Sequence, residues 1–192
     1  MFRKVLVLTC MIFFPAKAMT DNLITIDQIG DNNNIYVSQQ GSGHQAQITT
    51  GTAAPTSSND ISVLQKDTGA KLLNIDIPSG NYNTIQVVQD GAGNHNAGIQ
   101  NLNGNSNNIS IAQDGSGNHS MSIVGTGTNT SNTVTAVQIG NTGANKDFVL
   151  SLNGSQGANV NIRQDNPLVP DSSTMSIQCL TPPCGNYSYI KH

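Results

Sequence analysis

Apolar and polar positions alternate with a period of two in short runs along the chain. The unit apolar-x-apolar-x-Gln occurs seven times, as ITIDQ, IYVSQ, ISVLQ, IQVVQ, ISIAQ, VTAVQ and VNIRQ. A period of two places both apolar side chains and the glutamine on the same face of a strand. We therefore predict seven short strands, at residues 24–28, 35–39, 61–65, 85–89, 109–113, 134–138 and 160–164.

These units recur at a nearly constant distance. From Gln39 onward the glutamines lie 26, 24, 24, 25 and 26 residues apart. A second, weaker apolar alternation lies between them, at residues 46–48, 75–77, 97–99, 121–123 and 148–152. Each repeat therefore carries two strands and two turns, which is the pattern of one coil of a solenoid. The spacing predicts an all-β fold, a β-solenoid of about six two-stranded coils stacked in register.

In such a stack, each inward glutamine lies beside the glutamine of the coil above and the coil below. A single buried amide without a partner is costly. A column of identical amides satisfies its donors and acceptors along the stack, as in amyloid-type amide ladders. We predict that the stacking ladder consists of Gln28, Gln39, Gln65, Gln89, Gln113, Gln138 and Gln164.

Glycine and asparagine lie between the strands, where the chain must turn. Both residue types adopt left-handed backbone conformations readily, so we interpret them as corners of the coils. The predicted corner residues are Gly30, Asn33, Gly41, Gly91, Asn94, Gly104, Asn107, Gly115, Asn118 and Gly140. His44, His95 and His119 occupy similar positions, and we interpret them as surface turn residues, with metal binding or pH sensing as the alternatives.

Composition agrees with stacked β-structure. The chain contains 25 Asn and 14 Gln, all 11 acidic residues are Asp, and only 10% of residues are charged. Strong helix formers are scarce, which argues against a helical bundle. An Asn- and Gln-rich chain is either disordered or prone to stacked β-structure. No catalytic or phosphate-binding motif occurs, so we predict no enzyme activity, cofactor, metal site or small-molecule substrate.

The N-terminus has the pattern of an export signal. Arg3 and Lys4 precede an apolar run over residues 5–14, and Ala16-Lys17-Ala18 follows. We predict a cleavable secretory signal peptide at residues 1–18, with a lipoprotein signal at Cys10 as the weaker alternative. Cleavage moves the net charge from −3 to −6, because three of the eight cationic residues are removed. A mildly acidic chain gives no reason to expect nucleic-acid binding.

The remainder divides into two parts. Residues 19–166 form the predicted solenoid, with an insertion near 49–59, and residues 167–192 form a C-terminal tail. Cys179 and Cys184 are the cysteines left after processing, and an even pair in an exported protein favours a local disulfide loop. Free thiols or an intermolecular link are the alternatives. The tail is either a cap of the solenoid or a further irregular coil.

The repeats resemble those of the curlin family. Gln28-x-Gly30-x-x-Asn33-x-Ile35-x-x-x-Gln39 is similar to the curlin repeat Q-x-G-x-x-N-x-A-x-x-x-Q. The segment from Leu102 to Gln113 repeats the pattern with Leu in place of the first Gln, and partial copies begin at Gln39, Gln89 and Gln113. The resemblance extends over residues 22–166. The period of 24–26 residues is longer than the spacing usual in that family.

The resemblance implies a subunit of curli fibres, which are extracellular functional amyloids on the surface of Gram-negative bacteria. It implies self-assembly into a homopolymeric fibre, contact with other curli subunits and passage through an outer-membrane secretion pore, with roles in biofilm matrix and surface adhesion. Whether the chain would be a major or a nucleating subunit stays open. The alternatives are a soluble secreted β-solenoid that binds ice or glycan through a flat face, suggested by TGTNTSNTVT at residues 126–135, and a disordered matrix polymer.

Overall fold

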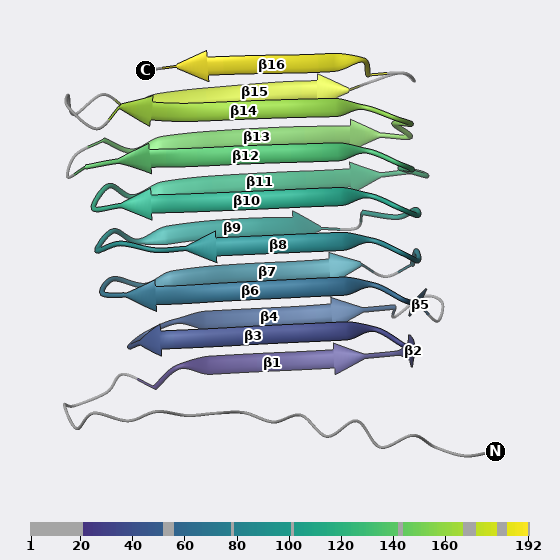
Figure 1. The fold of residues 1–192 in the computed structure, drawn as a ribbon, viewed down its shortest axis with the longest axis horizontal. Coiled ribbons are helices and arrows are strands. Elements are labelled where there is room, and N and C mark those ends of the chain that lie inside the picture. The colour runs from purple at the N-terminus through teal and green to yellow at the C-terminus, as the bar shows by residue number, and fades with distance from the viewer. Residues whose placement is uncertain are drawn as a thin grey trace.

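A computed structural model describes residues 21–51, 56–77, 79–100, 102–141, 144–166, 172–179 and 184–191. Most of its strands form two parallel sheets (Figure 1). In spatial order, the first sheet contains β1 (Leu23–Gln28), β4 (Gln45–Thr50), β7 (Lys71–Ile77), β9 (His95–Gln100), β11 (His119–Thr126), β13 (Lys146–Asn153) and β15 (Ser173–Cys179). The described residues contain no helix, and so none that could cross a membrane.

The second sheet faces the first. In spatial order it contains β3 (Asn34–Gly41), β6 (Asp60–Asp67), β8 (Thr84–Gln89), β10 (Asn108–Gly115), β12 (Thr133–Gly140), β14 (Asn159–Asn166) and β16 (Asn186–Lys191). Two short strands, β2 (Gly30–Asp31) and β5 (Thr56–Ser57), pair with each other at one corner. Because the chain alternates between the two sheets, each pair of strands makes one coil of a solenoid.

We number the coils from the N-terminus. Coils 1 to 7 consist of β1 with β3, β4 with β6, β7 with β8, β9 with β10, β11 with β12, β13 with β14, and β15 with β16. The predicted all-β solenoid of about six coils is therefore confirmed, and coils 1 to 6 lie within residues 23–166. Strands β15 and β16 extend the two sheets by a seventh coil, at the end opposite to β1 in Figure 1.

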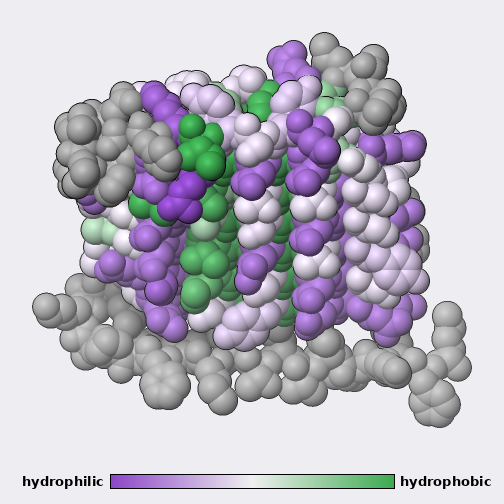
Figure 2. All heavy atoms as spheres, turned by 45° about the horizontal axis from the view of Figure 1, so that its top comes forward, coloured by the Kyte–Doolittle hydropathy of each residue, from purple (hydrophilic) through white to green (hydrophobic). Residues whose placement is uncertain are grey.

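The coils stack in register, so equivalent residues form columns along the solenoid. One inner column contains Ile35, Ile61, Ile85, Ile109, Val134 and Val160. Branched aliphatic side chains fit a pleated strand and fill the space between the two sheets. Figure 2 shows the same order on the outside, where side chains of one kind line up across successive strands. The alternation of the sequence thus separates a dry interior from a polar exterior.

Several sequence-based expectations lie outside the described residues. They are the signal peptide at residues 1–18, residues 52–55 of the expected insertion, and residues 167–171 and 180–183 of the tail. On either side of residues 52–55, Thr49 and Thr50 end β4, while Thr56 and Ser57 form β5.

Candidate functional site: side-chain ladders and solenoid ends

A ladder of glutamine side chains runs along the inside of the second sheet. The Nε2 of each glutamine donates to the Oε1 of the glutamine in the next coil. The donor–acceptor distances are 2.7 Å from Gln39 to Gln65, 2.8 Å from Gln65 to Gln89, and 2.9 Å for the steps to Gln113, Gln138 and Gln164. The five glutamines from Gln65 to Gln164 are at most 1% exposed.

The same amides also join the two sheets. Nε2 of Gln89 donates to the backbone oxygen of Leu72 at 3.0 Å, and Nε2 of Gln113 donates to that of Asn96 at 3.0 Å. Gln65 and Gln138 make equivalent bonds to Gln45 and Ser120. Each buried amide therefore has partners for both its donor and its acceptor, which removes most of the cost of burying it.

The ladder has a direction, so its two ends differ. Gln39 is the first rung, and no donor to its Oε1 occurs among the described residues. At the other end, Nε2 of Gln164 donates to Oγ of Ser173 at 3.1 Å and to the backbone oxygen of Asp147 at 3.2 Å. The N-terminal end of the ladder thus presents an acceptor, while the C-terminal rung already has partners for its donor.

The placement of Gln28 in this ladder is wrong. Gln28 ends β1 in the first sheet, where it lies opposite Thr50, whereas the other predicted rungs lie in the second sheet. Gln28 lies 11 residues before Gln39, which is less than half a repeat. Half a repeat carries the chain from one sheet to the other, so the two glutamines cannot lie in the same column. Thr50 is followed in the same column by Ile77, so no second glutamine rung forms there.

A second ladder, of asparagines, lies at the corner before the second-sheet strand of each of coils 1 to 5. Nδ2 of each asparagine donates to Oδ1 of the preceding one, at 3.1 Å for Asn59 to Asn33, 3.0 Å for Asn83 to Asn59 and for Asn107 to Asn83, and 2.9 Å for Asn132 to Asn107. Sequence reasoning placed Asn33 and Asn107 at corners and missed the other three. The signal was present, because an asparagine lies two residues before Ile61, Ile85 and Val134.

The predicted corner residues fall at two different corners. Gly30, Asn33, Gly104 and Asn107 lie where the chain passes from the first sheet to the second. Gly41, Gly91, Asn94, Gly115, Asn118 and Gly140 lie where it returns. At the returning corner, Oδ1 of Asn118 accepts a hydrogen bond from the backbone N–H of Asn94 at 3.1 Å, and Oδ1 of Asn94 accepts one from Ala70 at 2.8 Å.

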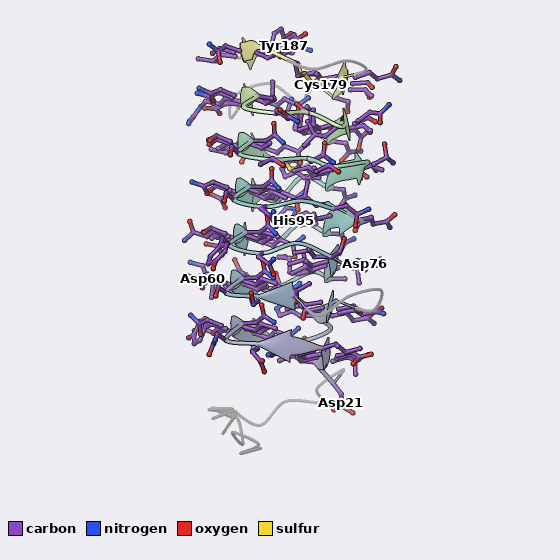
Figure 3. The ribbon with its side chains drawn as sticks, turned by 90° about the vertical axis from the view of Figure 1, so that its right-hand side faces the viewer. Asp21, Asp60, Asp76, His95, Cys179 and Tyr187 are labelled. Carbon is purple, nitrogen blue, oxygen red and sulfur yellow. A yellow bond between two sulfur atoms is a disulfide. The ribbon has the colours of Figure 1, made fainter. Side chains whose placement is uncertain are left out.

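Buried basic side chains form a third column, at the start of the strands of the first sheet. In register, the column contains His44, Lys71, His95, His119, Lys146 and Ser173. The histidines are at most 2% exposed, so their interpretation as surface turn residues is wrong. Figure 3 shows His95 within the stack, whereas Asp60 and Asp76 lie at its outer faces. The rings of His95 and His119 stack at 5.0 Å with an interplanar angle of 2°.

Backbone carbonyl groups surround this column. Nζ of Lys71 donates to the carbonyl oxygens of Thr68, Gly91 and Gly93 at 2.7 Å each and to that of Gly69 at 3.3 Å. Burial lowers the pKa of Lys71, and it lowers the pKa of His95 to about 4. The pKa values of His44 and His119 are lowered for the same reason.

The histidine rings use one nitrogen each. Nε2 contacts a backbone oxygen, at 2.6 Å from Asp90 for His95 and at 3.0 Å from Asp114 for His119, while the buried Nδ1 atoms have no hydrogen-bond partner. Among the described residues, no group of three or more His, Cys, Asp or Glu side chains is arranged to hold a metal ion. The three histidines of the column are therefore neutral imidazoles packed at a corner.

The last coil contains a disulfide. Cys179 at the end of β15 bonds to Cys184 just before β16, and both residues are buried. The bond ties together the two strands of coil 7, whose Cys179 and Tyr187 lie at one end of the stack in Figure 3. It closes the coil at the corner where coils 1 to 5 carry the asparagine ladder.

With this geometry in place, comparison with known proteins gives a match at the N-terminal end of the solenoid. Residues 20–51, which cover coil 1 and the first strand of coil 2, match the family model described as the curlin associated repeat. This part of the chain is therefore similar to a curlin repeat. The curlin family is a structural, non-enzymatic family found in extracellular curli fibres. No curated protein and no solved structure matches this chain.

Proposed function

We propose that this chain is a structural subunit of extracellular curli-type functional amyloid fibres and assembles by edge-to-edge stacking of its coils. The observation that carries the proposal is the glutamine ladder, which continues through six coils with steps of 2.7–2.9 Å. In-register parallel strands with stacked amides are the chemistry of amyloid fibrils. A coil from another chain could therefore repeat the contact that successive coils already make.

The ends of the solenoid supply the edges for such stacking. Strands β1 and β3 form one end of the two sheets, and β15 and β16 form the other. An edge strand presents unpaired backbone N–H and C=O groups, which can pair with a strand of another chain. Ile35 and Val37 of β3 are partly buried against the core, so a stacked coil would also cover their apolar side chains.

The cellular context follows from the curlin resemblance. The proposal includes export with cleavage of residues 1–18, passage through an outer-membrane pore, contact with other curli subunits, and fibres on the bacterial surface that serve in biofilm matrix and adhesion. It includes no catalytic activity, cofactor, nucleic acid or small-molecule substrate.

The alternative of a soluble binder for ice or glycan finds less support. Such a protein needs a regular array of threonines on a flat face. Thr133 and Thr135 on β12 have asparagine or serine as their column neighbours on β10 and β14, namely Asn108, Asn159, Ser110 and Asn161. The threonine-rich segment therefore does not repeat from coil to coil.

The proposal is tested by assembly of the mature chain from Met19. We expect sedimentable fibres with cross-β reflections near ~4.8 Å and ~10 Å. Val37→Lys places a charge on the inward face of the edge strand β3 and should prevent pelleting. Tyr36→Lys, on the outward face of the same strand, is the matched control and should pellet like the parent chain. A parent chain that stays monomeric would contradict the proposed function.

A further inference from the structure

The two ends of the solenoid present different side chains to an incoming coil. At the N-terminal end, the inward positions of β3 are Ile35, Val37 and Gln39, which match the inward residues of the next coil. We call this end, formed by β1 and β3, the N-terminal face. It can accept a coil of the same kind, because Gln39 Oε1 is an acceptor for a glutamine amide.

The C-terminal face, formed by β15 and β16, breaks the same columns. Tyr187 lies opposite Val160, Tyr189 opposite Ile162, and Lys191 opposite Gln164. Aliphatic columns that run through six coils thus end in tyrosines, each 44% exposed, and the glutamine column ends in a lysine. The asparagine ladder ends at Asn132, because the next residue in that column is Ala158. Its backbone N–H donates to Oδ1 of Asn132 at 2.9 Å, but it has no side-chain amide to continue the ladder.

These differences make a joint between two copies unfavourable. Stacking coil 1 of a second copy on coil 7 would enclose the hydroxyl groups of Tyr187 and Tyr189 in two aliphatic columns. It would also enclose the ammonium group of Lys191 in the glutamine column. Buried hydroxyl groups need partners, and a buried cation needs several. Lys71 is buried at a corner, where four carbonyl oxygens surround its Nζ. The glutamine column instead offers one carbonyl oxygen of the facing sheet at Gln89 and Gln113, and two at Gln65, Gln138 and Gln164.

We propose that the N-terminal face is the matched docking surface of this chain, and that its partner is another curlin-repeat chain whose last coil carries inward aliphatic-x-aliphatic-x-Gln. A second copy of this chain is the poorer partner, because its C-terminal face lacks that pattern. The inference rests on the proposed function. It adds that chains join in one direction, through the N-terminal face, and that the C-terminal coil limits fibre growth.

A full-chain variant can restore the missing pattern. Tyr187→Ile, Tyr189→Val and Lys191→Gln give β16 the inward residues of β3 and leave the N-terminal face unchanged. We call this the restored chain. A matched control substitutes the outward positions of the same strand, with Ser188→Thr and Ile190→Thr. Lys191→Gln alone changes a single side chain and serves as a second variant in case the triple substitution impairs folding.

The test measures elongation from sheared seeds in all four combinations of parent and restored chains, by light scattering and by fibre length in electron micrographs. Restored chains on restored seeds should elongate at least tenfold faster than parent chains on parent seeds, because every joint then pairs two matched faces. Parent chains on restored seeds should make one fast addition and then elongate at the parent rate, because each added chain again presents the parent C-terminal face. Lys191→Gln chains on their own seeds should elongate at an intermediate rate, and the outward control should behave like the parent.

The outcomes separate this inference from the proposed function. Equal elongation of restored chains on restored seeds and of parent chains on parent seeds would overturn the inference and leave fibre formation intact. Elongation of restored chains on restored seeds, with no assembly of the parent alone, would support the docking surface and contradict homopolymer formation. No growth in any combination, including the Lys191→Gln seeds, would overturn both.

Discussion

At the scale of the residue, the structure shows why amides rather than charged groups line the interior of this solenoid. An amide both donates and accepts, so identical side chains can repeat along a column without accumulating charge. Gln89 and Gln113 each give one hydrogen bond to the next rung and receive one from the rung before. A column of aspartates or lysines would instead repel itself in a medium of low dielectric constant.

The glutamine ladder should therefore be sensitive to replacement by an apolar residue of similar size. Gln113→Leu leaves Gln138 Oε1 and the backbone oxygen of Asn96 without their donor, and Gln89 Nε2 without its ladder acceptor. We expect the free energy of unfolding to fall by about 2–4 kcal/mol, because each unsatisfied buried group costs about 1–3 kcal/mol. Urea denaturation of the mature chain under non-assembling conditions measures it.

The control is the same substitution on the outward face of a neighbouring strand. Gln86 lies on β8 and is exposed, so Gln86→Leu should change the free energy of unfolding by less than about 0.5 kcal/mol. Equal effects of the two substitutions would mean that the ladder hydrogen bonds contribute nothing beyond ordinary strand packing.

The buried histidines predict a loss of stability in mild acid. The pKa of His95 is about 4 in the folded chain, chiefly because of burial, with Lys71 and His119 adding to the effect. The unfolded value is about 6.5. Above that pH the imidazole is neutral in both states. Between about pH 6.5 and 4 the unfolded chain binds the proton that the folded chain excludes, so stability falls as the pH is lowered.

Urea midpoints measured from pH 7 to pH 4.5 check this expectation. The midpoint should decrease over that window in the parent chain, and it should decrease less in His95→Asn, which removes one of the three buried imidazoles. A midpoint that is constant or that rises on acidification would show that the histidines are not held neutral by the fold.

The residues also show what the sequence could and could not predict. Parity alone places Ile35, Val37 and Gln39 on one inner face, because a period of two admits no other arrangement in a strand. Parity cannot tell which sheet a strand joins, so Gln28 was assigned to the wrong column. The sequence also does not predict that a corner histidine is buried. The burial of His95 depends on the residues that stack above and below it, Lys71 and His119.

At the scale of the element, the corners set the limits on what each coil tolerates. Gly104 has φ +138°, and a Cβ added there would lie against the backbone oxygen of Asn129 in the next coil. Successive coils approach so closely at this corner that the site requires glycine for both conformation and space. The strands between corners are less demanding, since their outward positions face solvent.

Gly104→Ala should consequently destabilise the fold by about 2 kcal/mol or more, through backbone strain and overpacking together. Gly98 in β9 is the control, because an added Cβ meets no atom within 4 Å and its φ is not positive. Gly98→Ala should be neutral or slightly stabilising. Thermal unfolding followed by circular dichroism distinguishes the two variants, and similar melting temperatures would show that the corner can relax.

At the scale of the whole molecule, the fold was predictable because one signal repeats. A single apolar-x-apolar-x-Gln unit is weak, but units at 24–26 residues imply coils that stack in register. The tail lacks that signal. Strand β16 carries Tyr187, Tyr189 and Lys191 at the inward positions, so the period does not extend into it, and the sequence supports a further coil only as one of two alternatives for the tail. The backbone pairing with β14, rather than the side-chain pattern, places it there.

A repeat held together by contacts between neighbouring coils should survive removal of one whole coil. Deleting residues 84–107 joins Asn83 to Asn108, so β10 would follow β7 and pair with β6 in the register that β8 now has. Gln65 would meet Gln113, and Asn83 would meet Asn132, which continues both ladders. If the seven coils contribute equally, the free energy of unfolding falls by about one seventh. Deleting residues 84–95 removes β8 and His95, the first residue of β9, and directs the rest of that first-sheet strand into the second sheet, which inverts the alternation of the remaining coils. We therefore expect the 24-residue deletion to keep the far-ultraviolet spectrum and a cooperative melt, and the 12-residue deletion to lose both. Loss of the fold in the longer deletion would mean that the coils are not interchangeable, and that β8 and β9 make contacts which the remaining strands cannot replace.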